Sequence, residues 1–299
     1  MNFETRELVN PSTRQLTNLQ FSIIIPTYKR NDLLTLCLQR LQPGAQSLEE
    51  SLYEVIVTDD AADDATEQLL LTQFPWATYT AGPQRGPAAN RNHGASLATG
   101  QWLVFTDDDC LPDAQWLQAY ADAIELHPDC KAFEGAILPD NWALLKKDMA
   151  ECPVNTEGGC FWSANIMVAH SLFQELGGFD EQFIIAAQED QDLQWRIQQQ
   201  HDIVFVQQAT VVHPVRKKQW RKSLQTCHIR AKNHEQYCRK IAVVSNNIFV
   251  PLQHYANSIR YQSRVCFQQL RLGHIGHASI ALYTVMRFYL PQYLQSLLR

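Results

Sequence analysis

The chain has 299 residues, of which 45% are hydrophobic and 19% charged, a composition typical of a globular protein with one large domain or two modest ones. No apolar run approaches the roughly 18 residues that a membrane-spanning helix requires. The polar segment 1–20 lacks the pattern of a signal peptide or an anchor. We therefore expect a cytoplasmic protein that does not cross a membrane.

The net charge of -6 conceals a strong asymmetry along the chain. Up to His213 there are 11 basic and 30 acidic residues, whereas from Pro214 onward there are 14 basic residues and the single acid Glu235. A basic C-terminal region indicates an anionic partner such as a membrane surface or nucleic acid, or docking onto the acidic part of the same chain.

The eight cysteines form no Cys-x-x-Cys pair and no zinc-ligand spacing. Several of them lie in apolar periodic stretches, where a free thiol behaves as a small hydrophobe. We therefore expect free thiols in a reducing cytosol.

Strand and helix patterns alternate over residues 21–127, beginning with the β-branched run Phe21-Ser-Ile-Ile-Ile-Pro26. The first helix is expected to begin at a capping residue, Asn31 or Asp32. Further strands are expected at 53–58, 77–81 and 102–105, and further helices at 65–74, 86–100 and from 113 onward. This alternation predicts an α/β fold, with a Rossmann-like, mostly parallel sheet and helices on both faces.

The pattern changes after residue 127. We expect strands at 132–138, near 168, at 203–206 and at 211–212, a short helix at 172–176, a helix that opens at Glu189, and an irregular loop over 139–157. From Arg216 the pattern is helical and basic, with helices near 252–272 and 280–290, the last broken by Pro291. The chain is therefore divided into a domain at 21–214 and a basic helical C-terminal region at 215–299.

Carboxylates follow two of the expected strands. Asp107, Asp108 and Asp109 follow the apolar run that ends at Phe105, and Asp59 and Asp60 end an earlier strand. Ligands of open α/β sheets bind at the carboxyl ends of the strands. A divalent metal that holds a diphosphate would allow such a cluster to stay ionised, because hard cations bind carboxylate and phosphate oxygens. The alternative is a solvated acidic loop.

Several motifs then occur in an order typical of one enzyme family: Ser22-Ile-Ile-Ile-Pro-Thr-Tyr-Lys-Arg30, the acidic segment 54–66, the segment 86–94, Phe105-Thr-Asp-Asp-Asp109 and Gln188-Glu-Asp-Gln-Asp-Leu193. Over roughly residues 21–214 the chain resembles the family 2 glycosyltransferases, which have the GT-A fold and use nucleotide-sugar donors. The resemblance implies transfer of a sugar from a nucleoside-diphosphate sugar, most often a UDP-sugar, to the hydroxyl group of a glycan or lipid-linked acceptor, with inversion of configuration.

The resemblance also assigns site residues. It implies that the nucleotide sugar is bound by Pro26, Thr27, Tyr28, Arg30, Asp59, Asp60, Arg91, Asp107 and Asp108. It implies Mn²⁺ or Mg²⁺ as cofactor, with Asp109, Asp107 and His213 as ligands, and it places Trp162, Asn165 and Gly178 on the acceptor side. An imidazole among carboxylates slightly favours Mn²⁺. The alternatives are a structural role for His213 and a surface ion pair for Arg91.

The chemistry of glycosyl transfer suggests roles for the acid pair at 189–190. A carboxylate can activate the acceptor hydroxyl as a general base, and burial beside another acid would raise its pKa in the required direction. Asp190 is the candidate base, with Glu189 beside it. The alternative is that both acids only cap the helix that begins there.

Two features depart from the family pattern. Ala61 and Ala62 follow the acid pair at 59–60 where the family usually has glycine, and the C-terminal region matches no motif.

Two other functions compete with this interpretation. A sugar-phosphate nucleotidyltransferase would need a glycine-rich loop after the first strand, and residues 21–42 contain no glycine. An inactive binding domain is disfavoured, because the chain has the side chains expected for catalysis at Asp107, Asp109, Glu189, Asp190 and His213.

We expect the C-terminal region to contact an anionic membrane peripherally, at the inner face of the cell membrane, and we expect no nucleic-acid partner.

Overall fold

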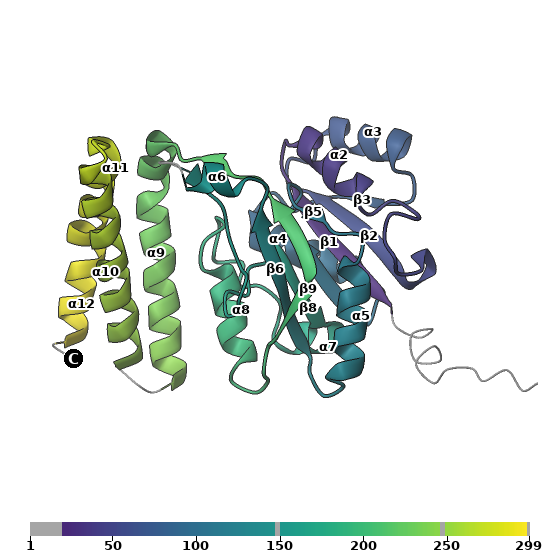
Figure 1. The fold of residues 1–299 in the computed structure, drawn as a ribbon. Helices are drawn as coiled ribbons and strands as arrows, with labels where there is room; N and C mark the ends of the chain where they lie inside the picture. Colours follow the sequence, from purple (N-terminus) through teal and green to yellow (C-terminus); the bar gives the residue numbers. More distant parts are fainter. Residues whose placement is uncertain (1–19, 147–149, 246–248, 298–299) are drawn as a thin grey trace, which may run out of the picture. The chain divides into compact units, whose positions relative to one another are not determined.

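The computed structural model describes residues 20–146, 150–245 and 249–297 (Figure 1). It forms two compact units. The body unit contains the residues up to Asp140 together with Pro153–Ile184 and Leu193–Pro214. The helical unit contains Asn141–Cys152, Ile185–Asp192 and the residues from Val215 on. The segments 141–152 and 185–192, which the sequence analysis grouped with the domain at 21–214, thus belong to the helical unit. The expectation of no signal peptide concerns residues 1–20, nearly all of them outside the described residues.

One eight-stranded sheet forms the centre of the body unit, with the strand order β3-β2-β1-β4-β8-β6-β9-β5. The neighbours β3, β2, β1 and β4 are parallel, β8 is antiparallel to both β4 and β6, β6 and β9 are parallel, and β5 is antiparallel to β9. In the order of the sheet, the strands are Thr78–Ala81, Tyr53–Asp59, Phe21–Thr27, Trp102–Thr106, Asn165–Ala169, Ala132–Pro139, Val204–His213 and Leu111–Pro112.

The central strands explain why the acids gather at one edge. β1 and β4 are buried along their whole length, as expected for strands covered on both faces, and their sequences are continuous apolar runs. Ile24 pairs with Phe105, and Thr27 pairs with Asp59. The carboxyl ends of β1, β2 and β4 therefore lie side by side, and the segments that follow them share one edge of the sheet (Figure 1).

The helices of the body unit are α2, α3, α4, α5 and α7, with the last part of α8. Their bounds are Asn31–Gln39, Asp64–Gln73, Pro87–Leu97, Trp116–Leu126, His170–Glu175 and Glu189–Ile197. The expected cap of α2 was wrong, because the N-cap residue is Arg30 and no side chain caps the helix. The side chain of Asn31 instead accepts a hydrogen bond from the hydroxyl group of Thr66 at 3.0 Å.

Two further expectations are corrected by long-range pairing. The residues expected as two short strands near 203–212 form the single strand β9, because a register shift opposite Gly135 and Ala136 takes up the irregular residues. The expected loop 139–157 contains the short helix α6 (Trp142–Leu145) and the strand β7 (Ala150–Glu151). β7 pairs with β10 (Arg216–Lys217), which is distant in sequence.

The helical unit is built mainly from α9, α10, α11 and α12, with the bounds Trp220–Ser245, Phe249–Arg271, Ile275–Thr284 and Leu290–Leu297. Ala231, Cys238, Tyr255 and Tyr289 form its buried centre. The expected break at Pro291 was wrong. The helical backbone continues from the π-helical segment Val285–Tyr289 through Pro291 to Leu297. None of the helices within the described ranges is both long and apolar enough to cross a membrane.

Candidate active site

Asp108 connects the end of β4 to the turn after β1. Its Oδ2 accepts hydrogen bonds from the Thr27 hydroxyl group at 2.7 Å and from Arg30 Nε at 3.1 Å, and its Oδ1 lies 2.5 Å from Arg30 Nη2. The Asp108 side chain is fully buried. Burial raises its pKa to about 6, although Arg30 and Thr27 act in the opposite direction. Asp108 is thus the buried partner of Thr27 and Arg30, two residues predicted at this site.

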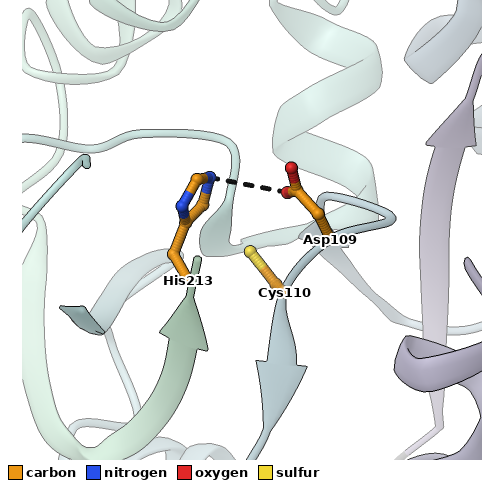
Figure 2. Close-up of side chains that lie close together, drawn as sticks. All are labelled: Asp109, Cys110 and His213. Carbon is orange, nitrogen blue, oxygen red and sulfur yellow. Dashed lines mark ion pairs between the residues drawn. The ribbon is translucent and has the colours of Figure 1, made fainter. Parts of the chain in front are cut away.

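Asp109, Cys110 and His213 form the one group of potential metal ligands found among the described residues (Figure 2). The Nε2 atom of His213 lies 3.5 Å from Oδ1 of Asp109. The Nδ1 atom of His213 lies 2.9 Å from the carbonyl oxygen of Pro214. Because a carbonyl oxygen only accepts, Nδ1 must carry the proton, which leaves the lone pair of Nε2 directed toward Asp109.

The protonation states of these groups suit a hard cation. Burial lowers the pKa of His213, although the charge of Asp107 opposes this effect, so the imidazole is neutral at pH 7. Burial raises the pKa of the Cys110 thiol well above its usual value, and sulfur is a soft ligand that hard cations bind poorly. The oxygen of Asp109 and the nitrogen of His213 remain as donors, a set that fits Mn²⁺ or Mg²⁺.

Asp107 is paired with Arg91 of α4. The Nη2 atom of Arg91 lies 2.8 Å from Asp107 Oδ1, and its guanidinium lies 5.7 Å from the ring centre of Phe179. Burial acts to raise the pKa of Asp107, but the charge and the hydrogen bond of Arg91, together with the charge of Arg30, outweigh it, so its pKa lies below the usual value. Arg91 itself is buried, with 4% of its surface exposed, and is therefore not a surface ion-pair residue.

Three adjacent carboxylates lie at this edge, and two guanidinium groups contact them. Arg30 binds Asp109 through Nη1 at 3.1 Å as well as Asp108, and Arg91 binds Asp107. Carboxylate oxygens gathered beside an imidazole nitrogen favour the binding of a divalent cation. This gathering of donor atoms is the physical observation that supports a metal site.

Asp59 and Asp60 are bonded to nearby backbone. Asp59 is fully buried, and its carboxylate accepts from the N–H groups of Ala61 at 2.9 Å and Asp63 at 3.3 Å. Asp60 accepts from the N–H groups of residues 84 and 86. Ala62, which stands where the family usually has glycine, has a φ of 49°. The turn therefore keeps a left-handed residue without glycine.

Two other residues predicted to bind the nucleotide differ in exposure. Pro26 is buried in β1, where it pairs with Thr58. The Tyr28 side chain is 56% exposed, and Nζ of Lys29 lies 5.5 Å from its ring centre. Tyr28 thus offers an accessible aromatic face beside the turn that holds Arg30, a surface on which a nucleobase can stack.

The three residues predicted on the acceptor side have different environments. Asn165 is buried and uses its whole amide: Oδ1 accepts from Trp116 Nε1 and Tyr120 Oη, and Nδ2 donates to two backbone carbonyl oxygens, all at 2.8 Å. It therefore holds the core together. Trp162 is partly buried. Gly178 has a φ of 71° and lies in a loop after α7.

Two residues that the sequence analysis did not single out hold this loop. Asn92 of α4 donates to the Phe179 carbonyl oxygen at 2.8 Å and accepts from the Phe179 N–H at 2.9 Å. Arg196 of α8 donates to the Gly178 carbonyl oxygen at 2.7 Å. Asn92 lies in the segment 86–94, so the sequence contained the motif but gave no sign of this contact.

Glu189 and Asp190 begin α8 and belong to the helical unit. The Oε2 atom of Glu189 accepts from the N–H of Ala187 at 2.7 Å, and this contact holds the segment that leads into α8. Asp192, two residues further, is fully buried and lies 2.7 Å from Nζ of Lys240. Asp190 is thus the member of the acid pair that we retain as candidate base.

Comparison with known proteins gives a family match for the N-terminal part of the chain. Residues 22–141 match the family Glycosyl transferase family 2. The chain is 34% identical over 102 residues to the glycosyltransferase AglE of Haloferax volcanii, covering 32% of this chain and 33% of that protein. It is 28% identical over 110 residues to a glucosyl-dolichyl phosphate glucuronosyltransferase of the same organism, covering 32% and 35%. The matching segment thus spans about a third of the length of these relatives.

Solved structures agree on the fold over a larger part of the chain. The mannosyltransferase PcManGT of Pyrobaculum calidifontis, in complex with GDP-Man and Mn²⁺, matches with a TM-score of 0.57 at 17% identity, over 92% of this chain and 87% of that one. TarS of S. aureus matches with a TM-score of 0.57 at 18% identity, over 75% and 40%. At this identity the likeness shows the fold, which is GT-A with a helical C-terminal region.

Proposed function

Residues 22–141 belong to glycosyl transferase family 2, and from this premise we propose that the protein transfers a sugar from a nucleoside-diphosphate sugar to an acceptor hydroxyl, with a divalent metal and with inversion of configuration. The observation that carries the proposal is the cluster of donor atoms at the end of β4, where Asp109 Oδ1 and His213 Nε2 lie 3.5 Å apart. When bound there, Mn²⁺ or Mg²⁺ would act as a Lewis acid that stabilises the charge of the departing diphosphate.

The residues around the metal ligands hold the donor. Arg91, buried beside Asp107, neutralises a phosphate oxygen, and the exposed Tyr28 ring stacks on the base. Asp59 and Asp60 shape the turn that faces the base, because their carboxylates fix the backbone at 61–63 and 84–86. We propose UDP as the nucleotide, with GDP as the alternative. A solved TarS structure contains UDP-GlcNAc, and PcManGT contains GDP-Man.

Asp190 removes the proton from the acceptor hydroxyl as the sugar is transferred. An ionised carboxylate within reach of the acceptor hydroxyl is suited to this role. Trp162 and Gly178 lie on the acceptor side in this proposal, whereas Asn165 is left out because its amide is fully bonded within the core.

The acceptor class follows from the relatives and from the charge of the chain. The name of one relative includes a dolichyl phosphate and that of another an undecaprenol diphosphate, so we propose a lipid-linked or polymeric glycan acceptor. After Glu235 the chain has no acid and seven Lys and Arg residues. On α10, the exposed apolar residues Tyr261, Phe267 and Leu270 accompany three arginines at 260, 264 and 271.

We further propose that this basic helical unit contacts anionic membranes from the cytoplasmic side. Each Lys or Arg near such a surface contributes on the order of 1 kcal/mol, screened by salt. Flotation with vesicles of phosphatidylcholine, with and without phosphatidylglycerol, tests this contact. Binding only to the anionic vesicles, weakened by 0.5 M salt and by charge reversal at 216–222, is expected. Equal recovery with both kinds of vesicle would refute it.

A combined binding and turnover assay tests the main function. UDP, GDP and their sugars are screened by thermal shift with Mn²⁺ or with a chelator, and each donor that stabilises the protein is then followed for release of nucleoside diphosphate. We expect stabilisation and release that both require the metal. Stabilisation without release, with or without added glycosides, would indicate an inactive binding domain. Equal stabilisation in chelator would refute the metal site.

A further inference from the structure

A buried acid in the middle of β6 holds the loop that precedes β8. Glu134 is 3% exposed. Its carboxylate accepts four hydrogen bonds from residues 155–161: from Gly159 N at 2.5 Å, Phe161 N at 2.8 Å, Asn155 Nδ2 at 2.9 Å and Cys160 N at 3.1 Å. Three successive backbone N–H groups thus converge on one carboxylate. A concave arrangement of this kind binds anions, and here the anion is part of the protein.

The conformation of this loop is costly without such a partner. Gly158 and Gly159 have φ values of 83° and 88°, and Phe161, which is not a glycine, has a φ of 45°. L-residues rarely adopt this region, and the surrounding structure must enforce it. Glu134 accepts from all three N–H groups and thereby enforces the conformation. An unpaired buried N–H would otherwise be unfavourable.

The loop is bonded to two other segments of the body unit. At its C-terminal end, the Ala164 carbonyl oxygen accepts from the hydroxyl group of Thr106 at 3.0 Å, and Thr106 immediately precedes the three acids. In its middle, the Gly159 carbonyl oxygen accepts from Gln194 Nε2 at 3.2 Å. Gln194 lies one turn after Asp190 in α8. The same loop carries Trp162, which directly follows the strained Phe161.

We infer that Glu134 is a positioning residue for transfer, which fixes the loop 155–164 and, through Gly159 and Gln194, the last part of α8 within the body unit. It does not touch the donor. Its loss should therefore leave nucleotide binding intact and impair the step that needs the acceptor side and the base. This inference rests on the proposed function for its catalytic consequence, whereas the fixing of the loop can be tested independently.

Glu134→Gln is the informative variant. The amide has the same shape, but its NH₂ group cannot accept, so part of the four-donor arrangement is lost. Glu134→Asp keeps the charge on a shorter side chain and serves as the conservative variant. Glu54→Gln is a matched control: Glu54 is also a carboxylate that holds a loop, with bonds from Ser22 Oγ at 2.6 Å and from Thr99 N and Oγ1 at 2.7 Å. It lies at the opposite end of the strands from the acids.

Hydrogen–deuterium exchange measures the loop directly. In Glu134→Gln we expect peptides covering 156–162 to exchange at least about tenfold faster, and those covering 190–197 to exchange faster as well, with a smaller change in Glu134→Asp. In Glu54→Gln the change should be confined to the segment around Thr99. Unchanged exchange of 156–162 in Glu134→Gln would overturn the inference.

Turnover then separates positioning from simple stability. With Mn²⁺ and UDP-glucose, UDP-GlcNAc or GDP-mannose, we expect kcat for donor turnover to fall about 10- to 100-fold in Glu134→Gln, with the donor KM and the Kd for UDP or GDP within twofold of wild type. Glu54→Gln should keep its kcat, even if it melts at a similarly reduced temperature. Equal loss of kcat in both variants would overturn the inference. A wild-type protein that turns over none of these donors would refute the proposed function instead, and the exchange experiment would still decide whether Glu134 fixes the loop.

Discussion

Replacing Asp109 with asparagine should abolish metal-dependent nucleotide binding without destabilising the metal-free protein. Asparagine keeps the size of the side chain and can still accept from Arg30 Nη1, which lies 3.1 Å from Asp109 Oδ2. Its negative charge is lost, and with it the anionic oxygen ligand that Asp109 offers to the proposed metal.

The size of the effect can be worked out from mass action. A ligand at 100 times its Kd stabilises the native state by about 2.7 kcal/mol, which for a unit of this size corresponds to a rise in Tm of about 5 to 10 °C. Removing one partner of a buried charge pair costs about 3 kcal/mol or more, or roughly 100-fold in affinity. The same ligand concentration then equals Kd, and the expected rise falls to about 1 °C.

Thermal shift with UDP or GDP, in Mn²⁺ and in chelator, measures both parts of this prediction. The matched control is Asp122→Asn, which removes one charge from the exposed part of α5 and should keep the full shift. A variant at Asp109 that retained the full Mn²⁺-dependent shift would contradict the metal assignment. A metal-free variant that melted more than about 5 °C below wild type would instead show that Asp109 is needed for stability.

Asp190→Asn should lower kcat about 100-fold or more while the donor Kd changes little, because a base acts on the acceptor; loss of nucleotide binding in calorimetry would show a structural role. Gly178→Ala should cost about 2 to 4 kcal/mol in denaturant unfolding, because its Cβ would lie 2.6 Å from Asn92 Oδ1 at a φ of 71°. Gly177→Ala has the same strain but no contact within 4 Å and should cost only about 1 kcal/mol, so equal costs would exclude the clash. Burial, assisted by His254, lowers the pKa of His234 to about 4, below the value of about 6.5 in the unfolded chain. The unfolded chain therefore takes up the proton first, and the free energy of unfolding should fall by up to about 3 kcal/mol between pH 6.5 and 4. Melting followed by circular dichroism from pH 7.5 to 4 should show this loss in wild type and a smaller one in His234→Gln, and identical profiles would refute the assignment.

Local sequence determined the elements of the sheet and the edge that carries the acids. The apolar runs of β1 and β4 are buried throughout, and continuous apolar runs of this length are typical of central parallel strands. Because parallel strands end at a common edge, the acids that follow β2 and β4 could be predicted to gather there. The order of the motifs indicated the family, because each motif is a short local segment that forms a turn or the start of a helix.

The partners of individual side chains could not be predicted in the same way. Nothing near Asp108 in sequence indicates Thr27, which is 81 positions away. Asn165 looked like an acceptor ligand, but Trp116 and Tyr120 occupy its amide oxygen. Likewise, Pro291 predicted a helix break, but the helical backbone continues through Pro291 after a π-helical segment.

Glu134 illustrates the limit most clearly. A single acid within an apolar strand was visible in the sequence of β6, yet its function depends on three N–H groups more than 20 residues away. Strand and helix signals arise from neighbours along the chain, so a sequence contains them directly. The hydrogen bonds that position a site join residues that are distant in sequence and meet only when the strands pair and the core excludes water. A buried polar group that stays unpaired is unfavourable, so each such group finds a partner in the folded structure.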